Sequence, residues 1–331
     1  LAQLKALDHG QDAVIQALIC CYKWWLSETD CDGFRIDAAK HCDPVALSFF
    51  VNAIREYAIS IGKMNFMCLA EVIGEDDEVL KYIGANLQPS DDRTAKYPYV
   101  TACFDFPLNF ELEEVLKGEK GWSALADRYK SLEESFRDYG RAGSYLVTFV
   151  ENHDQIRRAC FRYMHNEHDQ RLAMLAIGYL LLSMGIPCIY YGLEQAFDGG
   201  GEGGDGFVRE TMFGSDWGGR GITEGHLFDT QSPIFLFTRE VARLRRQQPA
   251  LRYGRQYFLN SAPDIDSLIR GELHPSVFAF TRVLDTCEFL IVVNVSDEPQ
   301  ECVIEHQQAE WKFDSQTNLI HGGEASVLRR V

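Results

Sequence analysis

The chain has 331 residues, 46% of them hydrophobic, which is enough for one large domain and a second small one. Its formal net charge is −17, from 32 basic and 49 acidic residues. This charge argues against nucleic acid or an anionic membrane as a partner, because both attract basic surfaces. The ten cysteines lack the paired spacing of metal sites.

Helical and strand-like segments alternate through most of the chain. Apolar residues at helical spacing predict a helix at 12–27, and Asp43 followed by Pro44 predicts the start of a helix that ends at Gly62. Apolar strands are predicted at 31–37, 65–71, 100–106, 145–150 and 186–191, and further helices at 75–83, 122–139, 169–184 and 232–248. This alternation is typical of parallel β/α units.

One uncharged run, 172–192, is long enough to span a membrane. Gly185 and Pro187 divide it, however, and its second part is rich in β-branched and aromatic residues. We therefore expect a buried helix followed by a buried strand, and no membrane span.

The character of the sequence changes near residue 253. Short strands rich in Val, Ile and Phe are predicted at 277–283 and 289–295, and no helical period remains. We expect an α/β domain at 1–252 and a small antiparallel β domain at 253–331.

The stretch CDGFRIDAAKH, residues 31–41, places Arg35 two residues before Asp37 inside an apolar run. In a strand these two side chains share one face, whereas Phe34 and Ile36 take the other face, which suits a layer of helices. A charged pair on the interior face of a strand is costly unless it is used or well paired.

Three carboxylates follow three of the predicted strands: Asp37, Glu71 and Asp154. Active sites form at this end of the strands in (β/α)₈ barrels and in doubly wound sheets, so the position alone leaves both folds open. Glycosidic bond cleavage needs one ionised carboxylate and one carboxylic acid. Arg35 would keep Asp37 ionised, Glu71 could serve as the acid, and Asp154 with His153 could hold sugar hydroxyls.

Several stretches together resemble the alpha-amylase family of glycoside hydrolases. CDGFRIDAAKH resembles the nucleophile motif of that family, LAEVIG its general-acid motif and TFVENHD its third-carboxylate motif. GIPCIYYGLEQ is similar to the eighth barrel strand and LRRQQPALRYG to the last barrel helix. The resemblance covers about residues 8–255 and implies a partial (β/α)₈ barrel, strands 4 to 8, followed by a small antiparallel β-sandwich. Closure needs eight strands, so we expect the other three to precede Leu1.

The resemblance implies that Asp37 is the nucleophile, Glu71 the general acid/base and Asp154 a stabiliser of the transition state, with Arg35 orienting Asp37. The implied reaction is hydrolysis of an α-glucosidic linkage with retention, through a covalent glycosyl–Asp37 intermediate. An α-1,4-glucan hydrolase acting on starch or maltooligosaccharides is the simplest reading. An α-glucosidase or a transglycosylase on trehalose- or sucrose-type substrates is the alternative, and a non-catalytic carbohydrate-binding member is a third.

The resemblance also implies substrate-binding residues. His153 would bind hydroxyls of the sugar being cleaved, and Lys40 and His41 would lie on the leaving-group side. The family has an earlier motif ending in Asn-His, which often supplies a calcium-ligating Asn, and no such motif precedes Asp37 here. We therefore expect no metal site in this chain, and leave calcium open for a full-length protein.

Overall fold

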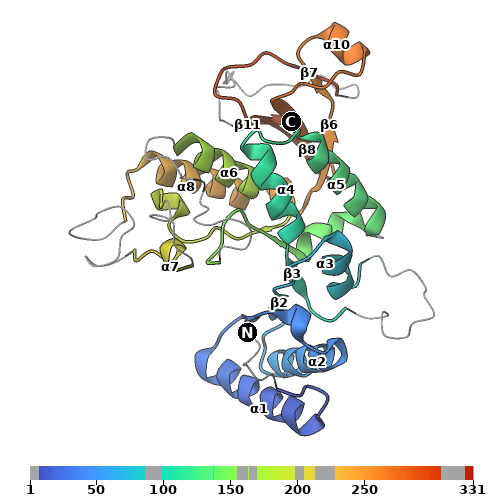
Figure 1. Ribbon diagram of the computed structural model, residues 1–331, viewed down its shortest axis with the longest axis vertical. Coiled ribbons are helices and arrows are strands. Elements are labelled where there is room, and N and C mark those ends of the chain that lie inside the picture. Colours follow the sequence, from blue (N-terminus) through green and yellow to red (C-terminus); the bar gives the residue numbers. More distant parts are fainter. Residues whose placement is uncertain are drawn as a thin grey trace. The chain divides into compact units, whose positions relative to one another are not determined.

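The computed structural model describes residues 7–85, 98–136, 138–154, 163, 170–197, 205–212, 228–306 and 325–330 (Figure 1). Contacts divide the chain into two compact units. The first comprises Leu1–Pro107 and Ser144–Val147, and the second comprises Leu108–Gly143 and Thr148–Val331.

The first unit is built from parallel strands that alternate with helices. Its elements are α1 (Asp12–Thr29), β1 (Gly33–Ile36), the 3₁₀ turn η1 (Ala39–His41), α2 (Pro44–Ser60), β2 (Met67–Ala70), α3 (Asp76–Tyr82), β3 (Ala102–Phe104) and most of β4 (Leu146–Thr148). The strands pair in parallel, with Arg35 opposite Leu69 and Cys103 opposite Leu146. Within this unit the strand order β1-β2-β3-β4 follows the chain without a switch point, which favours a barrel over a doubly wound sheet.

Local signals in the sequence explain how α1 and α2 are placed. The Asp43 carboxylate accepts the Ala46 N–H at 2.8 Å, and Pro44 occupies the first turn, as predicted for an N-cap. Tyr22 of α1 packs edge-on against Phe34 of β1, with 5.3 Å between ring centroids, and against Phe50 of α2 at 5.4 Å. One face of β1 therefore carries helices, as expected from the alternation of its side chains.

The second unit contains helices and antiparallel strands. Its helices are α5 (Ser123–Ser135), η3 (Tyr139–Ser144), α6 (Gln170–Leu182), η4 (Leu193–Gln195), α7 (Asp205–Val208), α8 (Pro233–Gln247), α9 (Pro249–Tyr253) and α10 (Ile265–Ile269), with α4 (Phe106–Leu116) lying mostly within it. Its strands are β5 (Ile186–Pro187), β6 (Arg255–Leu259), β7 (Ser261–Ala262), β8 (Val277–Leu284), β9 (Cys287–Asn294), β10 (Val303–Ile304) and β11 (Ala325–Arg330). The order β11-β9-β8-β6 is antiparallel throughout, and β10 pairs with β7 in a second antiparallel sheet. Antiparallel structure after residue 253 is thus confirmed, while the domain boundary at 252 stays a prediction.

Most predicted strands are longer than the observed ones, and the short helix α10 (Ile265–Ile269) lies in the region after residue 253 where no helix was predicted. The strand predicted at 100–106 is shorter, because α4 begins at Phe106. The sequence did not predict this helix, although Pro107 is tolerated in a first helical turn. The helix predicted at 122–139 ends at Ser135, and only Ile186–Pro187 of the run 186–191 is a strand. No helix within the described ranges is long and apolar enough to cross a membrane.

Two buried arginines hold the C-terminal end of α6. Arg245 donates to the carbonyl oxygens of Leu181, Ser183 and Gly185 at 2.6–3.0 Å. Arg282 donates to the carbonyl oxygens of Leu182 at 2.7 Å and Gly254 at 2.9 Å. These guanidinium groups satisfy carbonyls that a helix end leaves without partners.

Candidate active site

The ends of β1 and β2 bring two of the predicted carboxylates to neighbouring positions. The pairing continues past both strands, because the Glu71 N–H donates to the Ile36 carbonyl and the Ala39 N–H to the Glu71 carbonyl, each at 3.0 Å. Asp37 and Glu71 therefore follow adjacent parallel strands at their carboxyl ends, where enzymes of this architecture place their chemistry.

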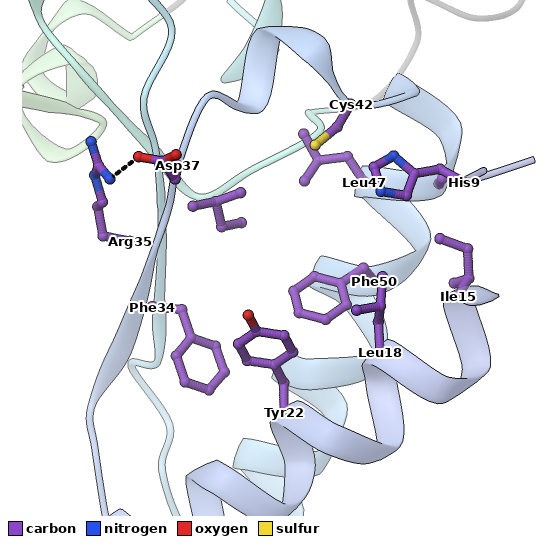
Figure 2. Close-up of a pocket in the computed structure, with 12 residues that line it drawn as sticks. His9, Ile15, Leu18, Tyr22, Phe34, Arg35, Asp37, Cys42, Leu47 and Phe50 are labelled. Carbon is purple, nitrogen blue, oxygen red and sulfur yellow. Dashed lines mark hydrogen bonds and ion pairs between the residues drawn. The ribbon is translucent and has the colours of Figure 1, made fainter. Parts of the chain in front are cut away.

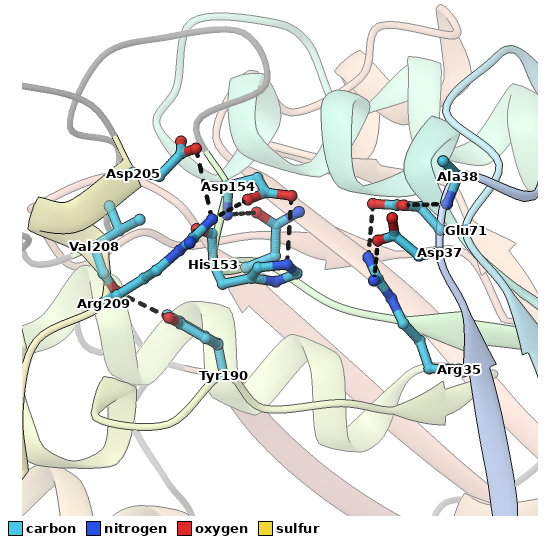
Figure 3. A network of polar contacts seen from close by, with 11 residues as sticks. Arg35, Asp37, Ala38, Glu71, His153, Asp154, Tyr190, Asp205, Val208 and Arg209 are labelled. Carbon is cyan, nitrogen blue, oxygen red and sulfur yellow. Dashed lines mark hydrogen bonds and ion pairs between the residues drawn. The ribbon is translucent and has the colours of Figure 1, made fainter. Parts of the chain in front are cut away.

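Arg35 links these two carboxyl groups (Figure 3). Its guanidinium forms an ion pair with Asp37 and another with Glu71, with 2.9 Å between Nη2 and Oε1. The second oxygen of Glu71 accepts the Ala38 N–H at 2.8 Å. Ala38 adopts a left-handed conformation, φ 45° and ψ 40°, which turns its N–H toward Glu71. The Glu71 side chain is 9% exposed and the Asp37 side chain 76%, so Asp37 is open to a ligand.

Lys40 and His41 follow in η1. The Lys40 ammonium binds Glu78 of α3 at 2.8 Å and the Ile73 carbonyl at 3.2 Å. The His41 backbone N–H donates to the Ala38 carbonyl at 2.9 Å, and its side chain is exposed. The Lys40 side chain is thus held by Glu78 of α3, and substrate binding by Lys40 and His41 stays a prediction.

A pocket of about 290 Å³ lies beside the Arg35–Asp37 pair (Figure 2). Its walls come from α1, β1 and α2, and Tyr22, Phe34 and Phe50 form an aromatic part of the lining. The pocket is thus lined by the charged end of β1 on one side and by apolar side chains between β1 and its helices on the other.

The third predicted carboxylate, Asp154, lies in a turn that follows β4. The Asn152 side-chain oxygen accepts the Asp154 N–H at 2.8 Å, and the His153 Nε2 lies 3.4 Å from Asp154 Oδ2 (Figure 3). The Asn109 amide of α4 donates to the carbonyls of Phe149 and Val150 at 3.2 and 3.1 Å. Asn109 therefore fixes the segment that leads into this turn, a role that the sequence did not indicate.

Arg209 was also missed by sequence reasoning. Its Nη2 binds Asp154 Oδ1 at 2.6 Å, and its Nε donates to the His153 carbonyl at 2.9 Å. Arg209 lies 55 residues after Asp154 in the sequence. No local pattern around Arg209 indicates that it contacts this motif.

The structure therefore brings the predicted residues into two groups. In the first unit Arg35 contacts both Asp37 and Glu71, whereas His153 and Asp154 contact each other in the second. That all three carboxylates serve one site stays a prediction. Among the described side chains, no three His, Cys, Asp or Glu residues gather as a metal-binding group.

Comparisons with known proteins give the family. The model of the alpha amylase catalytic domain matches residues 1–222. An alpha-amylase of Streptomyces lividans is 31% identical over 258 residues, 71% of this chain and 26% of that protein. A cyclomaltodextrin glucanotransferase of Bacillus sp. (strain 17-1) is 26% identical over 77% of this chain and 30% of its own length. The alpha-amylase SusG of Bacteroides thetaiotaomicron is 28% identical over 97% of this chain and 48% of its own length.

Solved structures agree on the fold. An Anoxybacillus alpha-amylase matches with a TM-score of 0.71 and 22% identity, over 98% of this chain and 64% of its own. The cyclomaltodextrin glucanotransferase CldA matches with a TM-score of 0.70 and 21% identity, over 99% of this chain and 62% of its own. The predicted fold class, a partial (β/α)₈ barrel followed by antiparallel β structure, is confirmed.

The chain spans between 26% and 48% of the three curated relatives named above. The match to the catalytic-domain model nevertheless covers well over half of the chain, residues 1–222. The predicted motifs around Asp37, Glu71 and Asp154 all lie inside that range. This protein belongs to the alpha-amylase family.

Proposed function

We propose that this chain carries the catalytic carboxylates of a retaining enzyme that cleaves α-glucosidic linkages, most simply those of an α-1,4-glucan such as starch. One observation carries the proposal: a single guanidinium, that of Arg35, binds Asp37 and Glu71 at the ends of adjacent parallel strands. A nucleophile and a proton donor that act on one glycosidic bond need carboxyl groups that lie close to each other.

In the first step, Asp37 attacks the anomeric carbon and forms a glycosyl ester. Glu71 gives its proton to the glycosidic oxygen, and the bond between that oxygen and the anomeric carbon breaks. The Arg35 ion pair holds the Asp37 carboxylate in place for this attack. The exposure of Asp37 leaves its oxygens accessible to a sugar.

In the second step, Glu71 takes a proton from water, and the resulting oxygen attacks the anomeric carbon of the ester. The bond to Asp37 breaks and its carboxylate is restored. Each step inverts the anomeric carbon, so the product keeps the α configuration. Asp154 stabilises the charge that develops on the sugar in both transition states, and His153 binds hydroxyls of the same sugar.

Lys40 and His41 contribute on the leaving-group side. The Lys40 ammonium binds Glu78 and the Ile73 carbonyl. A sugar that binds beside Lys40 replaces one of these two contacts with a hydrogen bond from the ammonium to a sugar hydroxyl. Membership of the alpha-amylase family supports an α-glucan or an α-glucoside as the partner.

Transfer to a sugar hydroxyl is the second candidate, because cyclomaltodextrin glucanotransferases are among the relatives that match 77% of the chain. The same residues serve both outcomes, and only the acceptor of the second step differs. Product analysis by chromatography separates them: hydrolysis yields shorter linear sugars, whereas transfer yields longer or cyclic ones.

The test of the proposal uses the complete polypeptide that carries this sequence, assayed on soluble starch, maltose, sucrose and trehalose. Asp37→Asn and Glu71→Gln should each lower kcat by roughly 10³-fold or more. Azide should partly restore turnover in Glu71→Ala, because the anion attacks the glycosyl ester without general-base help. Near-normal turnover in Asp37→Asn would overturn the proposal.

A further inference from the structure

We infer that Arg209 is a positioning residue that holds the His153–Asp154 turn in its working conformation. The inference rests on the proposed function, since it assumes that Asp154 stabilises the transition state. The contacts that carry it lie within the second unit, and Figure 3 draws those of Arg209 with His153, Asp154 and Asp205 and that of Tyr190 with Val208.

The backbone around Arg209 is fixed on both sides. The Tyr190 hydroxyl donates to the Val208 carbonyl at 3.0 Å, and the Tyr191 hydroxyl donates to the Glu210 carbonyl at 2.6 Å. Both tyrosines lie a few residues after β5 in the chain. Two hydroxyls from a strand end therefore hold the residues that flank Arg209, so its side chain starts from a defined position.

The Arg209 guanidinium contacts the turn at two kinds of atom. Nε donates to the His153 carbonyl at 2.9 Å, and Nη2 binds Asp154 Oδ1 at 2.6 Å. A planar guanidinium presents these donors at fixed angles. It therefore fixes the position of the Asp154 carboxylate relative to the His153 backbone carbonyl. A lysine, with a single ammonium on a flexible stem, cannot reproduce both contacts.

The two carboxylate oxygens of Asp154 have different neighbours. Arg209 binds Oδ1, while His153 Nε2 lies 3.4 Å from Oδ2. Asp205, four residues before Arg209, lies 3.5 Å from the same Nη2 and forms a second ion pair with the arginine. Arg209 thus orients Asp154 without being required to touch the sugar, and its loss should slow the chemical step more than it weakens substrate binding.

The experiment compares Arg209→Met and Arg209→Lys with Arg243→Met in the complete polypeptide, on soluble starch and on maltotriose. Arg243 is a matched control, because it is also a half-exposed arginine of the second unit that pairs with a carboxylate, Glu240. Arg209→Met should lower kcat by about 10-fold on both substrates with little change in KM, as for loss of a hydrogen bond to a charged group. Arg209→Lys should recover only part of this loss, and Arg243→Met should leave both constants unchanged.

A double-mutant cycle tests whether Arg209 acts through Asp154. Adding Arg209→Met to Asp154→Asn should cost little further turnover, because residues that act on one another are not additive. Tyr190→Phe, which removes an anchor without touching Asp154, should lower kcat in the same direction by a smaller factor.

The outcomes separate this inference from the proposed function. If Asp154→Asn strongly lowers turnover but Arg209→Met does not lower kcat, the positioning role is wrong and the proposed function stands. A pure rise in KM on starch alone, or full additivity in the cycle, also overturns the positioning role, because Arg209 would then bind sugar directly. If Asp154→Asn turns over normally, the proposed function fails and the inference fails with it.

Discussion

Arg35 and Glu71 form an ion pair across the ends of two adjacent parallel strands, with 2.9 Å between Nη2 and Oε1. The same guanidinium pairs with Asp37, so one cation lies between two carboxyl groups. Two ionised carboxyl groups on neighbouring strand ends repel each other, and a shared cation offsets that repulsion whenever both carry charge. The pair is therefore both a structural contact and the means by which two reacting groups are held together.

The first prediction concerns Arg35→Lys. An ammonium cannot bind two carboxylates in the planar geometry of a guanidinium, so Asp37 and Glu71 should lose their common orientation. We expect kcat on starch to fall roughly 10²-fold, as when one preorganised group is lost from an active site. Steady-state kinetics on the complete polypeptide measures this.

Lys63→Met is the matched control for this substitution. Lys63 also binds two carboxylates next to β1, Asp30 at 2.8 Å and Asp32 at 2.9 Å, but before the strand begins. Turnover should be unchanged in Lys63→Met. An equal loss in both variants would show that any cation beside β1 matters, and would contradict a specific role for Arg35.

The second prediction concerns stereochemistry. Two successive inversions restore the configuration, so the sugar released first from an α-glucan should be the α anomer. Proton NMR of a reaction followed from its first minutes distinguishes the two anomers before they equilibrate. A β-anomeric first product would rule out a glycosyl–Asp37 intermediate and leave the three carboxylates with other roles.

Much of the first unit could be predicted, because its signals are local. Asp43 and Pro44 mark a helix start within two residues, and the observed cap is the predicted one. The charges at Arg35, Asp37 and Glu71 stand out against apolar strands, and the parallel register then requires them to meet. In each case a short sequence pattern is enough to predict where the residues lie.

The parts that were missed depend on contacts between distant residues. In the sequence Arg282 looks like an ordinary charged residue of a strand, yet in the structure it is fully buried. Its burial is tolerated because the carbonyl oxygens of Leu182 and Gly254 accept its N–H groups. Asn109 and Arg209 act on the segment after β4 from 40 residues before it and 55 residues after it. No periodicity or spacing in the sequence encodes such pairs, since only tertiary folding brings them together.

The third prediction concerns Arg282, whose guanidinium is fully buried against carbonyl groups. Burial, together with the nearby charge of Arg245, lowers the pKa of Arg282 to about 9. Arg282→Ala leaves a cavity and two carbonyls without donors, and should lower the free energy of unfolding by about 3–5 kcal/mol. Arg282→Met fills the space and removes the cost of burying the charge, so it should lose less.

Urea unfolding of the chain measures this difference, with Arg255→Ala as the control. The Arg255 side chain is 53% exposed on β6 and lies 3.8 Å from Asp138, a contact too exposed to contribute much. Its removal should change the free energy of unfolding by less than about 1 kcal/mol. Equal losses in Arg282→Ala and Arg255→Ala would contradict the capping role of Arg282.

The last prediction concerns the pH dependence of stability at His274. This side chain is buried, its Nδ1 accepts the N–H groups of Ser276 and Val277 at 3.1 and 3.0 Å, and its carbonyl accepts the Trp122 indole N–H at 2.7 Å. A protonated ring would lose the acceptor at Nδ1. Burial lowers the pKa of His274 from 6.5, and a hydrogen bond to the Glu301 backbone opposes this only in part.

The sign of the effect follows from this direction. Because the folded pKa is lower than the unfolded one, the unfolded chain binds the additional proton first as the pH falls. The stability that neutral His274 contributes is therefore complete above the unfolded pKa of 6.5 and is lost as the pH falls toward the lower folded pKa. His274→Asn provides the comparison, since its side-chain oxygen can accept the same N–H groups and does not titrate. Thermal unfolding at about pH 8 and about pH 5 should show a larger loss of Tm in the parent than in His274→Asn. Equal losses in the two proteins would assign the acid sensitivity to other groups, because every remaining titratable residue is shared by both.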